Sequence, residues 1–274
     1  MLPELFNIGP LPIRAYGLML AVSFLLGVFY VRKQTQKDNR DFDNYLSIAY
    51  IMIFGGIFGA RFGYVILHLS EFTSNPIAVI NPFAAGSFGI AGLNLYGGLL
   101  LAIAGSVAFC RIKKMSILET FDYFAPTVGI GLVFTRVGCF CNGCCFGTPT
   151  DLPWGVVFPA GSIPFYQFGG QALHPAQLYS SLYGLLLFGL LHLMMKRKQF
   201  HGQLLAVLFM VEAFFRFVIE YVRFYEDAMV FTLGPLVPTY NQVVSLGLFI
   251  AGVAIYVMNR SKSLRVGLGS TAAE

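Results

Sequence analysis

Charged residues are scarce in this sequence. Of its 274 residues 11% are Asp, Glu, Lys or Arg and 57% are hydrophobic, whereas soluble domains carry about 25% charged residues. This composition predicts an integral membrane protein. The net charge of +5 is no argument for nucleic-acid binding, because the basic residues fall in short clusters between apolar stretches. The chain has no cleavable signal-peptide pattern, so the first apolar stretch is expected to be a membrane span.

Apolar stretches of about 20 residues are long enough to cross a bilayer as helices. We therefore expect an all-α polytopic membrane protein with seven transmembrane helices in a single integral membrane domain over residues 1–274. The spans are predicted near residues 13–31, 45–67, 89–109, 118–137, 177–195, 204–222 and 243–258.

The basic residues predict how these spans are oriented. Thirteen of the 18 Lys and Arg residues lie in alternate loops and the C-terminal tail, and two of the opposite loops, residues 69–88 and 138–173, contain none. Because cytoplasmic loops are enriched in Lys and Arg, we expect the N-terminus outside and the C-terminus in the cytoplasm.

Five arginines lie within or beside the predicted spans, toward the outer half: Arg14, Arg61, Arg136, Arg216 and Arg223. An Arg at the centre of a span costs roughly 2.5–3.5 kcal/mol on insertion scales. Glu212, Arg216 and Glu220 recur every four residues and share one helix face, either as an ion-pair ladder that orients the helix or as part of a site. Convergent guanidinium groups in apolar surroundings suit a phospholipid head group.

Residues 135–159 contain four cysteines, Cys139, Cys141, Cys144 and Cys145, directly after a span. Irregular backbone at this depth is tolerated where it lines a cavity or is packed in protein. The cysteines could form one or two disulfides, stay buried free thiols, or bind a metal, although zinc sites favour two separated knuckles or added His ligands. Cys110, at the cytoplasmic end of the third span, is expected to be a small buried hydrophobe.

Two further segments carry candidate site residues. Tyr96, Gly97 and Gly98 open the outer half of the third span, where paired glycines allow close approach by a helix or a ligand. His174 and Gln177, at the start of the fifth span, are either structural or part of a site. Tyr96 could take part in a site, or it could be an ordinary interfacial Tyr with no catalytic function.

The chain resembles the prolipoprotein diacylglyceryl transferase family over nearly its whole length. The resemblance rests on six ordered motifs: IRAYGLM from Ile13, GARFGYV from Gly59, TRVGCFCNGCCFG from Thr135, HPAQLY from His174, FFRFVIEYVR from Phe214 and NQVVS from Asn241. The family implies a bacterial inner-membrane enzyme, active toward the outer leaflet, that moves the diacylglyceryl group of phosphatidylglycerol to the lipobox cysteine of preprolipoproteins, releasing glycerol phosphate. It implies no metal or soluble cofactor. As partners it implies phosphatidylglycerol, lipobox signal peptides and membrane lipids, with no nucleic acid, and we expect a monomer.

The resemblance also assigns roles to residues. Arg136 is expected to hold the phosphate, with Arg216 and Glu220 as further catalytic residues. The other lipid-binding candidates are Tyr16, Arg61, Gly97, Gly98, Asn142 and Gly147. Where well-studied members have His-Gly-Gly, this chain has Tyr96-Gly97-Gly98, and Cys139 and Cys144 replace Asn and Glu, so the chain looks like a Cys-rich branch. The proton acceptor is left open among Tyr96, His174 and Glu220.

Other functions are compatible with these patterns. A divergent paralogue could use the fold for another lipid-transfer substrate. A membrane thiol–disulfide oxidoreductase could use the Cys139–Cys145 cluster, with Cys141 and Cys144 as a C-x-x-C pair. A transporter would predict two pseudo-symmetric halves, which the sequence does not show.

Overall fold

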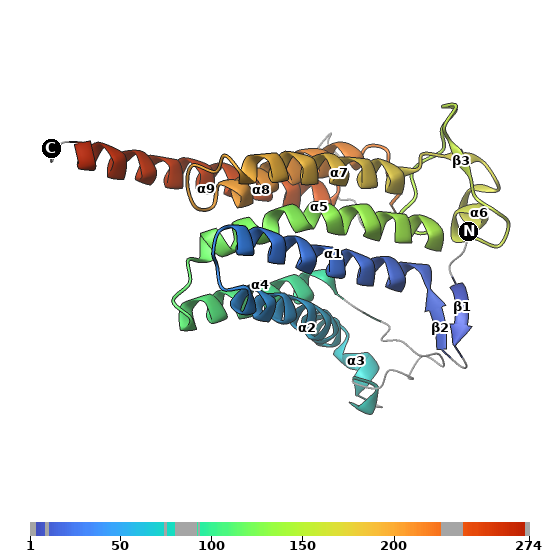
Figure 1. Cartoon of the computed structure of the whole chain (residues 1–274). Helices are drawn as coiled ribbons and strands as arrows, with labels where there is room; N and C mark the ends of the chain where they lie inside the picture. Colours follow the sequence, from blue (N-terminus) through green and yellow to red (C-terminus); the bar gives the residue numbers. More distant parts are fainter. Residues whose placement is uncertain are drawn as a thin grey trace. The chain divides into compact units, whose positions relative to one another are not determined.

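The structure is a computed structural model that describes residues 4–8, 11–73, 76–79, 92, 94–225 and 238–271. Its long helices are α1 (Ala15–Lys37), α2 (Phe42–Leu67), α4 (Leu95–Ile112), α5 (Ile117–Asn142), α7 (Ala176–Met195), α8 (Gln203–Ile219) and α9 (Tyr240–Thr271) (Figure 1). The short elements are helices α3 (Leu69–Phe72), α6 (Ile163–Phe168) and the 3₁₀ turn η1 (Pro76–Val79), and strands β1 (Glu4–Ile8), β2 (Leu11–Arg14), β3 (Val156–Val157) and β4 (Ala172–Leu173). Strands β1 and β2 pair, and β3 pairs antiparallel with β4.

Six of the described helices are long and apolar enough to cross a membrane: α1, α2, α4, α5, α7 and α9 as far as Ser263. The prediction of a helical, multi-span membrane protein is thereby confirmed. The predicted span 204–222 coincides with α8, which has 17 residues and is about 26 Å long at 1.5 Å per residue. This is slightly less than the roughly 30 Å of a hydrocarbon core, so the seventh span stays a prediction, as does the single membrane domain.

Helix caps explain where several helices begin. Helix α4 begins at Leu95 because the Asn94 side chain accepts a hydrogen bond from the Gly97 N–H at 3.0 Å, which satisfies one of the free donors of the first turn. Asp41 does the same for α2 by accepting from the Asp43 N–H at 3.1 Å. Residues 95–109 of the predicted span 89–109 lie in α4, and its residues 89–91 and 93 lie outside the described part.

The chain forms two compact units. The first contains Met1–Phe6, Ile13–Gly27 and Phe121–Glu274, and the second contains Asn7–Pro12 and Val28–Thr120. The first unit thus holds the beginning of α1, most of α5, and α6 to α9. The second holds the remainder of α1 and helices α2 to α4.

In the first unit, helices α5, α7 and α8 share an apolar core. Its buried residues are Ala125, Leu187, Leu191, Leu204 and Leu208, and α8 also packs along α9. The buried carboxylate of Asp122 on α5 accepts hydrogen bonds from the Gly202 and Leu205 N–H groups at 2.8 and 3.0 Å. A side chain 80 residues away therefore caps the start of α8.

In the second unit, helices α2 and α4 cross at glycines. A Cβ at Gly97 would lie 2.5 Å from the carbonyl oxygen of Gly59, and one at Gly98 would lie 2.6 Å from that of Gly56. Only glycine allows the two backbones to approach so closely. Gly97 and Gly98 therefore permit close approach by a helix, one of the two roles that the sequence left open. Their contact with lipid stays a prediction.

Candidate functional site

The site begins at the C-terminal end of α5, where α1 packs against it. A Cβ at Gly138 would lie 3.1 Å from the Tyr16 Cα and 3.2 Å from the Met19 Cβ, so this glycine permits the close crossing. Tyr16 is consequently within charge-interaction range of Arg136 and of the thiols of Cys139, Cys144 and Cys145. The first-span motif and the Cys-rich motif thus meet in space.

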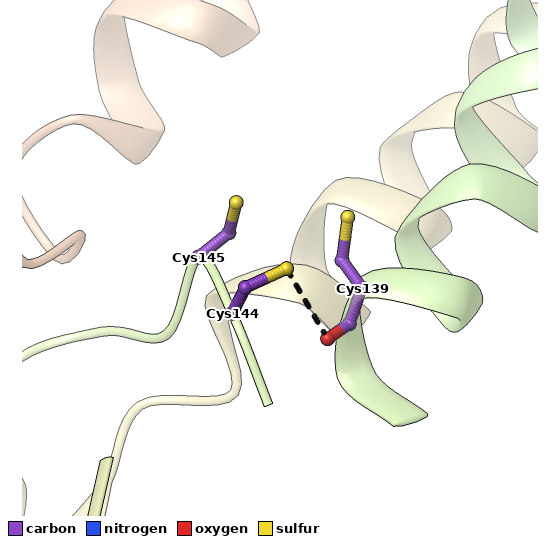
Figure 2. A group of neighbouring side chains, drawn as sticks. All are labelled: Cys139, Cys144 and Cys145. Atoms are coloured by element: carbon purple, nitrogen blue, oxygen red, sulfur yellow. Dashed lines mark hydrogen bonds between the residues drawn. The ribbon is translucent and has the colours of Figure 1, made fainter. Parts of the chain in front are cut away.

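After Asn142 the chain turns sharply and brings three cysteines together. Gly143 has φ +74° and Cys145 has φ +62°, a left-handed conformation that costs of order 1–3 kcal/mol for a residue with a side chain. The Cys144 N–H and Sγ both approach the Cys139 carbonyl oxygen, at 3.1 and 3.7 Å. The sulfur atoms of Cys139, Cys144 and Cys145 gather between the helix end and the loop, as Figure 2 shows, within 4.8 Å of one another.

All five cysteines are free thiols in the structure. Hydrogen bonds from the thiols of Cys139 and Cys144, together with the nearby guanidinium groups of Arg223 and Arg136, lower the pKa of Cys145. Cys141 lies outside this three-thiol cluster. Whether the cysteines form disulfides in the cell stays a prediction.

The loop after the cluster is clamped between two other segments. The Gly147 N–H donates to the His174 carbonyl and the Thr148 N–H to the Val222 carbonyl, both at 3.0 Å. A Cβ at Gly147 would lie 2.5 Å from the His174 Cβ and 2.5 Å from the Val222 oxygen. Gly147 therefore allows the Cys-rich loop to pass between the segment before α7 and the segment after α8.

Aromatic packing supports this clamp from the side. Phe146, Phe158 and Leu173 are buried together, and Phe224 stacks on Phe146 with ring centroids 5.8 Å apart. Gln177, at the start of α7, donates its side-chain amide to the Cys144 carbonyl at 2.7 Å. The loop that carries the thiols is thus held by the buried aromatic cluster, by Phe224 and by the Gln177 side chain.

At the end of α8, Glu220 is the centre of a polar network. Its Oε1 accepts from the Tyr225 hydroxyl at 2.7 Å and lies 3.0 Å from Nη2 of Arg216. Its Oε2 accepts from Thr239 Oγ1 at 2.8 Å and from the Asn241 amide at 3.5 Å. Burial raises the pKa of Tyr225 to about 12, so its hydroxyl stays protonated at neutral pH and can donate. Both carboxylate oxygens of Glu220 are occupied.

Glu212 lies one helical turn before Arg216 on α8 and belongs to a second polar group. Glu212 Oε1 accepts from the Tyr183 hydroxyl of α7 at 3.2 Å. Arg136 lies within charge-interaction range of Cys145, Tyr183, Cys139 and Glu212, and Glu212 within that of Arg216 as well. Helices α5, α7 and α8 thus bring two arginines and one carboxylate together inside the first unit.

Several buried polar atoms near these groups have no hydrogen-bond partner among the described residues: Glu212 Oε2, Arg216 Nη1, Arg223 Nε and Gln177 Oε1. Buried donors and acceptors are nearly always paired, so these atoms are available to bind a polar ligand or water. Beside it is a cavity of about 630 Å³, in the size range of small-molecule sites. Its lining combines polar groups and aromatic rings: Thr148, Phe217, Glu220, Tyr221, Arg223, Phe224, Tyr225, Pro238, Thr239, Gln242, Val243 and Leu246.

The predicted site residues divide between the two units. The first unit contains seven of them: Tyr16, Arg136, Asn142, Gly147, His174, Arg216 and Glu220. The second unit contains the other four: Arg61, Tyr96, Gly97 and Gly98.

Two of these residues lie near the Cys-rich loop. Asn142 is the exposed last residue of α5. The His174 ring contacts the Tyr179 hydroxyl at 3.3 Å, and this hydroxyl also accepts from Trp154 Nε1 at 2.7 Å. Their roles in binding or catalysis stay predictions.

In the second unit, Arg61 is held by backbone and aromatic groups. Its Nε donates to the Val79 carbonyl at 2.8 Å and its Nη1 to the Gly92 carbonyl at 3.3 Å. Its guanidinium lies over the Phe72 ring, 5.1 Å from the centroid. Tyr96 is half exposed in the first turn of α4.

Sequence reasoning did not single out Tyr183, Tyr225 or the unpaired oxygen of Glu212. The sequence did place Glu212 on one helix face with Arg216, because the two residues are four apart, but periodicity does not show which of its oxygens is paired. Tyr225 follows Glu220 by five residues in an irregular segment, where no periodicity predicts contact. Tyr183 reaches Glu212 only through the packing of α7 on α8, which the sequence does not encode locally.

Comparison with known proteins places these features in a family. The family model described as prolipoprotein diacylglyceryl transferase matches residues 3–258. A phosphatidylglycerol–prolipoprotein diacylglyceryl transferase of Pseudoalteromonas translucida is 32% identical over 259 residues, which cover 93% of this chain and 91% of that protein. Proteins of the same name from Campylobacter hominis and Bordetella avium are each 31% identical, over 93% and 96% of this chain and 90% and 96% of their own lengths.

Proposed function

This chain belongs to the prolipoprotein diacylglyceryl transferase family, and from that premise we propose that it transfers the diacylglyceryl group of phosphatidylglycerol to the lipobox cysteine of preprolipoproteins, the first step of lipoprotein maturation. The site assignment rests on two buried guanidinium nitrogens, Arg216 Nη1 and Arg223 Nε, which have no hydrogen-bond partner among the described residues and lie near an amphipathic cavity. We assign the phosphate of phosphatidylglycerol to this region. The aromatic and aliphatic lining suits its acyl chains.

The arginines bind and stabilise the phosphate. Arg136 on α5 and Arg216 on α8 both face Glu212, and guanidinium groups bind phosphate oxygens through paired, charge-assisted hydrogen bonds. Negative charge grows on the phosphate as the leaving group departs, so donors already in place stabilise the transition state more than the ground state. The Glu220 network holds Arg216 in position through Tyr225.

The reaction exchanges one bond at a glycerol carbon. The thiolate sulfur of the substrate cysteine forms a bond to the carbon, the carbon–oxygen bond to the phosphate breaks, and glycerol phosphate leaves with the bonding electron pair. A thiol has a pKa near 8.5, so its proton must pass to an acceptor or be released in a positive field. The product is a thioether.

Glu212 is the better placed of the two carboxylates to accept that proton. Glu220 already has partners at both oxygens, whereas Oε2 of Glu212 has none among the described residues. A general base needs a free oxygen within hydrogen-bond reach of the proton. We assign this role to Glu212, ahead of Tyr96, His174 and Glu220.

The topology belongs to the same proposal. The charge pattern of the loops supports an outer-leaflet site, an external N-terminus and α8 as a seventh span, all in the bacterial inner membrane. In this orientation the polar network at the end of α8 lies where a signal peptide and the head groups of external lipids meet. We expect the protein to act as a monomer.

Lipidation of a lipobox peptide by the purified protein in phosphatidylglycerol micelles, followed by mass spectrometry, tests the function. The wild type should add one diacylglyceryl group to the peptide thiol. Arg136→Ala should lower kcat/KM by roughly 100–1000-fold, the usual cost of losing one transition-state donor. Full activity in Arg136→Ala, in well-folded protein, would overturn the phosphate assignment.

A matched cysteine variant separates this function from a thiol–disulfide oxidoreductase. A C-x-x-C oxidoreductase needs both Cys141 and Cys144, but the sulfur of Cys144 gathers with Cys139 and Cys145, and Cys141 is not part of that cluster. The transferase should keep its activity in Cys141→Ser. A disulfide-exchange activity that disappears in the same variant would favour the oxidoreductase.

A further inference from the structure

The three-thiol cluster has no role in the transferase reaction as derived above, yet its cysteines are buried or partly buried, and their sulfur atoms are held close together by the fold. Cys139 is 6% exposed, Cys144 and Cys145 are partly buried, and all three sulfurs lie within 4.8 Å of one another. They come from a helix end and a clamped loop, so their separation is fixed by the fold. Cys145 adopts φ +62°, a conformation that costs energy and carries its sulfur into the group.

Three convergent thiols suit a soft metal ion better than other ligands. Thiolate sulfur selects monovalent copper and zinc over hard cations such as magnesium or calcium. Iron–sulfur clusters usually need four cysteines, and no His, Asp or Glu completes the group among the described residues. The donor set is therefore three sulfurs, which fits a three-coordinate ion, or zinc with water as its fourth ligand.

The geometry is close to what such an ion requires. A metal–sulfur distance of about 2.3 Å separates the sulfurs of a planar three-coordinate site by about 4 Å. The observed limit of 4.8 Å means that small side-chain rotations complete the site. Gln177 fixes the Cys144 carbonyl at 2.7 Å, the kind of outer contact that orients a ligand residue.

Electrostatics favours the loaded site. Three thiolates around a monovalent ion leave a net charge of −2 inside the protein. Arg136 and Arg223 both lie within charge-interaction range of Cys145, so two positive charges offset that excess. A buried charge is tolerated only when it is compensated in this way.

We propose that Cys139, Cys144 and Cys145 form a binding site for a thiophilic d¹⁰ metal ion, with monovalent copper as the best match to three sulfur donors. The proposal does not depend on the transferase activity, although the metal site would share Arg136 and Arg223 with the proposed phosphate region. Because the cluster lies beside Arg136, occupancy also places the ion next to the proposed phosphate site.

The test is metal competition on the reduced, full-length protein in detergent. Monovalent copper is offered in the presence of the chelator bicinchoninate, and zinc is offered separately against a zinc chelator. We expect one equivalent to be withdrawn per chain, with sulfur-to-copper charge-transfer absorption in the ultraviolet. Cys139→Ser, Cys144→Ser and Cys145→Ser should each weaken binding more than roughly tenfold, since even loss of an outer-shell partner costs 10–100-fold.

Cys141→Ser is the matched control, because it removes a partly buried cysteine of the same segment that lies outside the cluster. It should bind like the wild type. Zinc bound through the same three residues supports a thiophilic site and reassigns its ion. No binding of either ion, or binding that persists in the three cluster variants, overturns the proposal.

A second measurement avoids variants that fail to fold. Wild-type protein is alkylated with N-ethylmaleimide with and without monovalent copper, and each cysteine is quantified by mass spectrometry. The ion should protect Cys144 and Cys145 and leave labelling of Cys141 unchanged. Equal labelling of Cys144 and Cys145 in both samples overturns the proposal without any substitution.

Discussion

Two carboxylates on one face of α8 have different environments. Glu220 has a partner at each oxygen, from Arg216 and Tyr225 on one side and Thr239 on the other. Among the described residues, Glu212 has one hydrogen-bond partner, the Tyr183 hydroxyl, and its Oε2 has none. A fully paired carboxylate positions its neighbours, whereas a carboxylate with an unpaired oxygen can accept a proton.

Glu212→Gln should lower kcat by roughly 100–10,000-fold, the range attributed to general acid–base catalysis, with little change in KM for phosphatidylglycerol. The amide keeps the shape and can still accept from Tyr183, but it cannot take up a proton. Steady-state kinetics of peptide lipidation measure both constants. A rise in KM with unchanged kcat would show that Glu212 binds the substrate and does not handle the proton.

Tyr225→Phe should act differently. The hydroxyl donates to Glu220 and accepts from Arg216 and from Asn241, each at 3.1 Å, so its loss leaves one guanidinium less firmly held. We expect kcat/KM to fall by roughly 10–100-fold, since one hydrogen bond to a charged group contributes about 1.5–3 kcal/mol. Thermal stability should fall slightly. An unchanged kcat/KM would mean that the ion pair alone holds Arg216.

At the scale of elements, the loop from Cys144 to Thr148 depends on glycine. Gly147→Ala should destabilise the protein by about 1–3 kcal/mol, the usual cost of overpacking, because its Cβ would lie 2.5 Å from both the His174 Cβ and the Val222 oxygen. The control is Gly189→Ala, in α7, where a Cβ meets no atom within 4 Å. Thermal melts in detergent should separate the two variants, and equal melting temperatures would contradict the crowding.

The elements themselves were largely predictable from sequence. Hydrophobic length predicted the six helices that are long and apolar enough to cross a membrane, because a bilayer requires about 20 apolar residues. Hydrophobicity alone did not locate the start of α4, because the Asn94 cap lies within an apolar, glycine-rich run. The contact between Tyr16 and the Cys-rich motif depends on the close packing of α1 on α5 that Gly138 permits. Local sequence does not specify this packing.

At the scale of the whole molecule, the number of membrane crossings determines where the C-terminus lies. If α8 crosses the membrane, an epitope inserted at the exposed residues Ala160–Gly161 and a C-terminal tag should lie on opposite sides. We expect protease added to intact spheroplasts to remove the inserted epitope and to spare the tag until the membrane is permeabilised. If both epitopes are cleaved in intact spheroplasts, α8 does not cross.

The division of the chain into two units has a consequence for biosynthesis. The second unit is nearly continuous and is complete once residue 120 has been made, whereas the first needs both Ile13–Gly27 and Phe121–Glu274. At about 5–20 residues per second, Tyr16 leaves the ribosome roughly 6–24 s before Gly138, the residue it packs against. During that interval the first half of α1 must stay in the membrane without its final neighbours. The nascent protein therefore contains all of its second unit before it contains the proposed phosphate site, which belongs to the first.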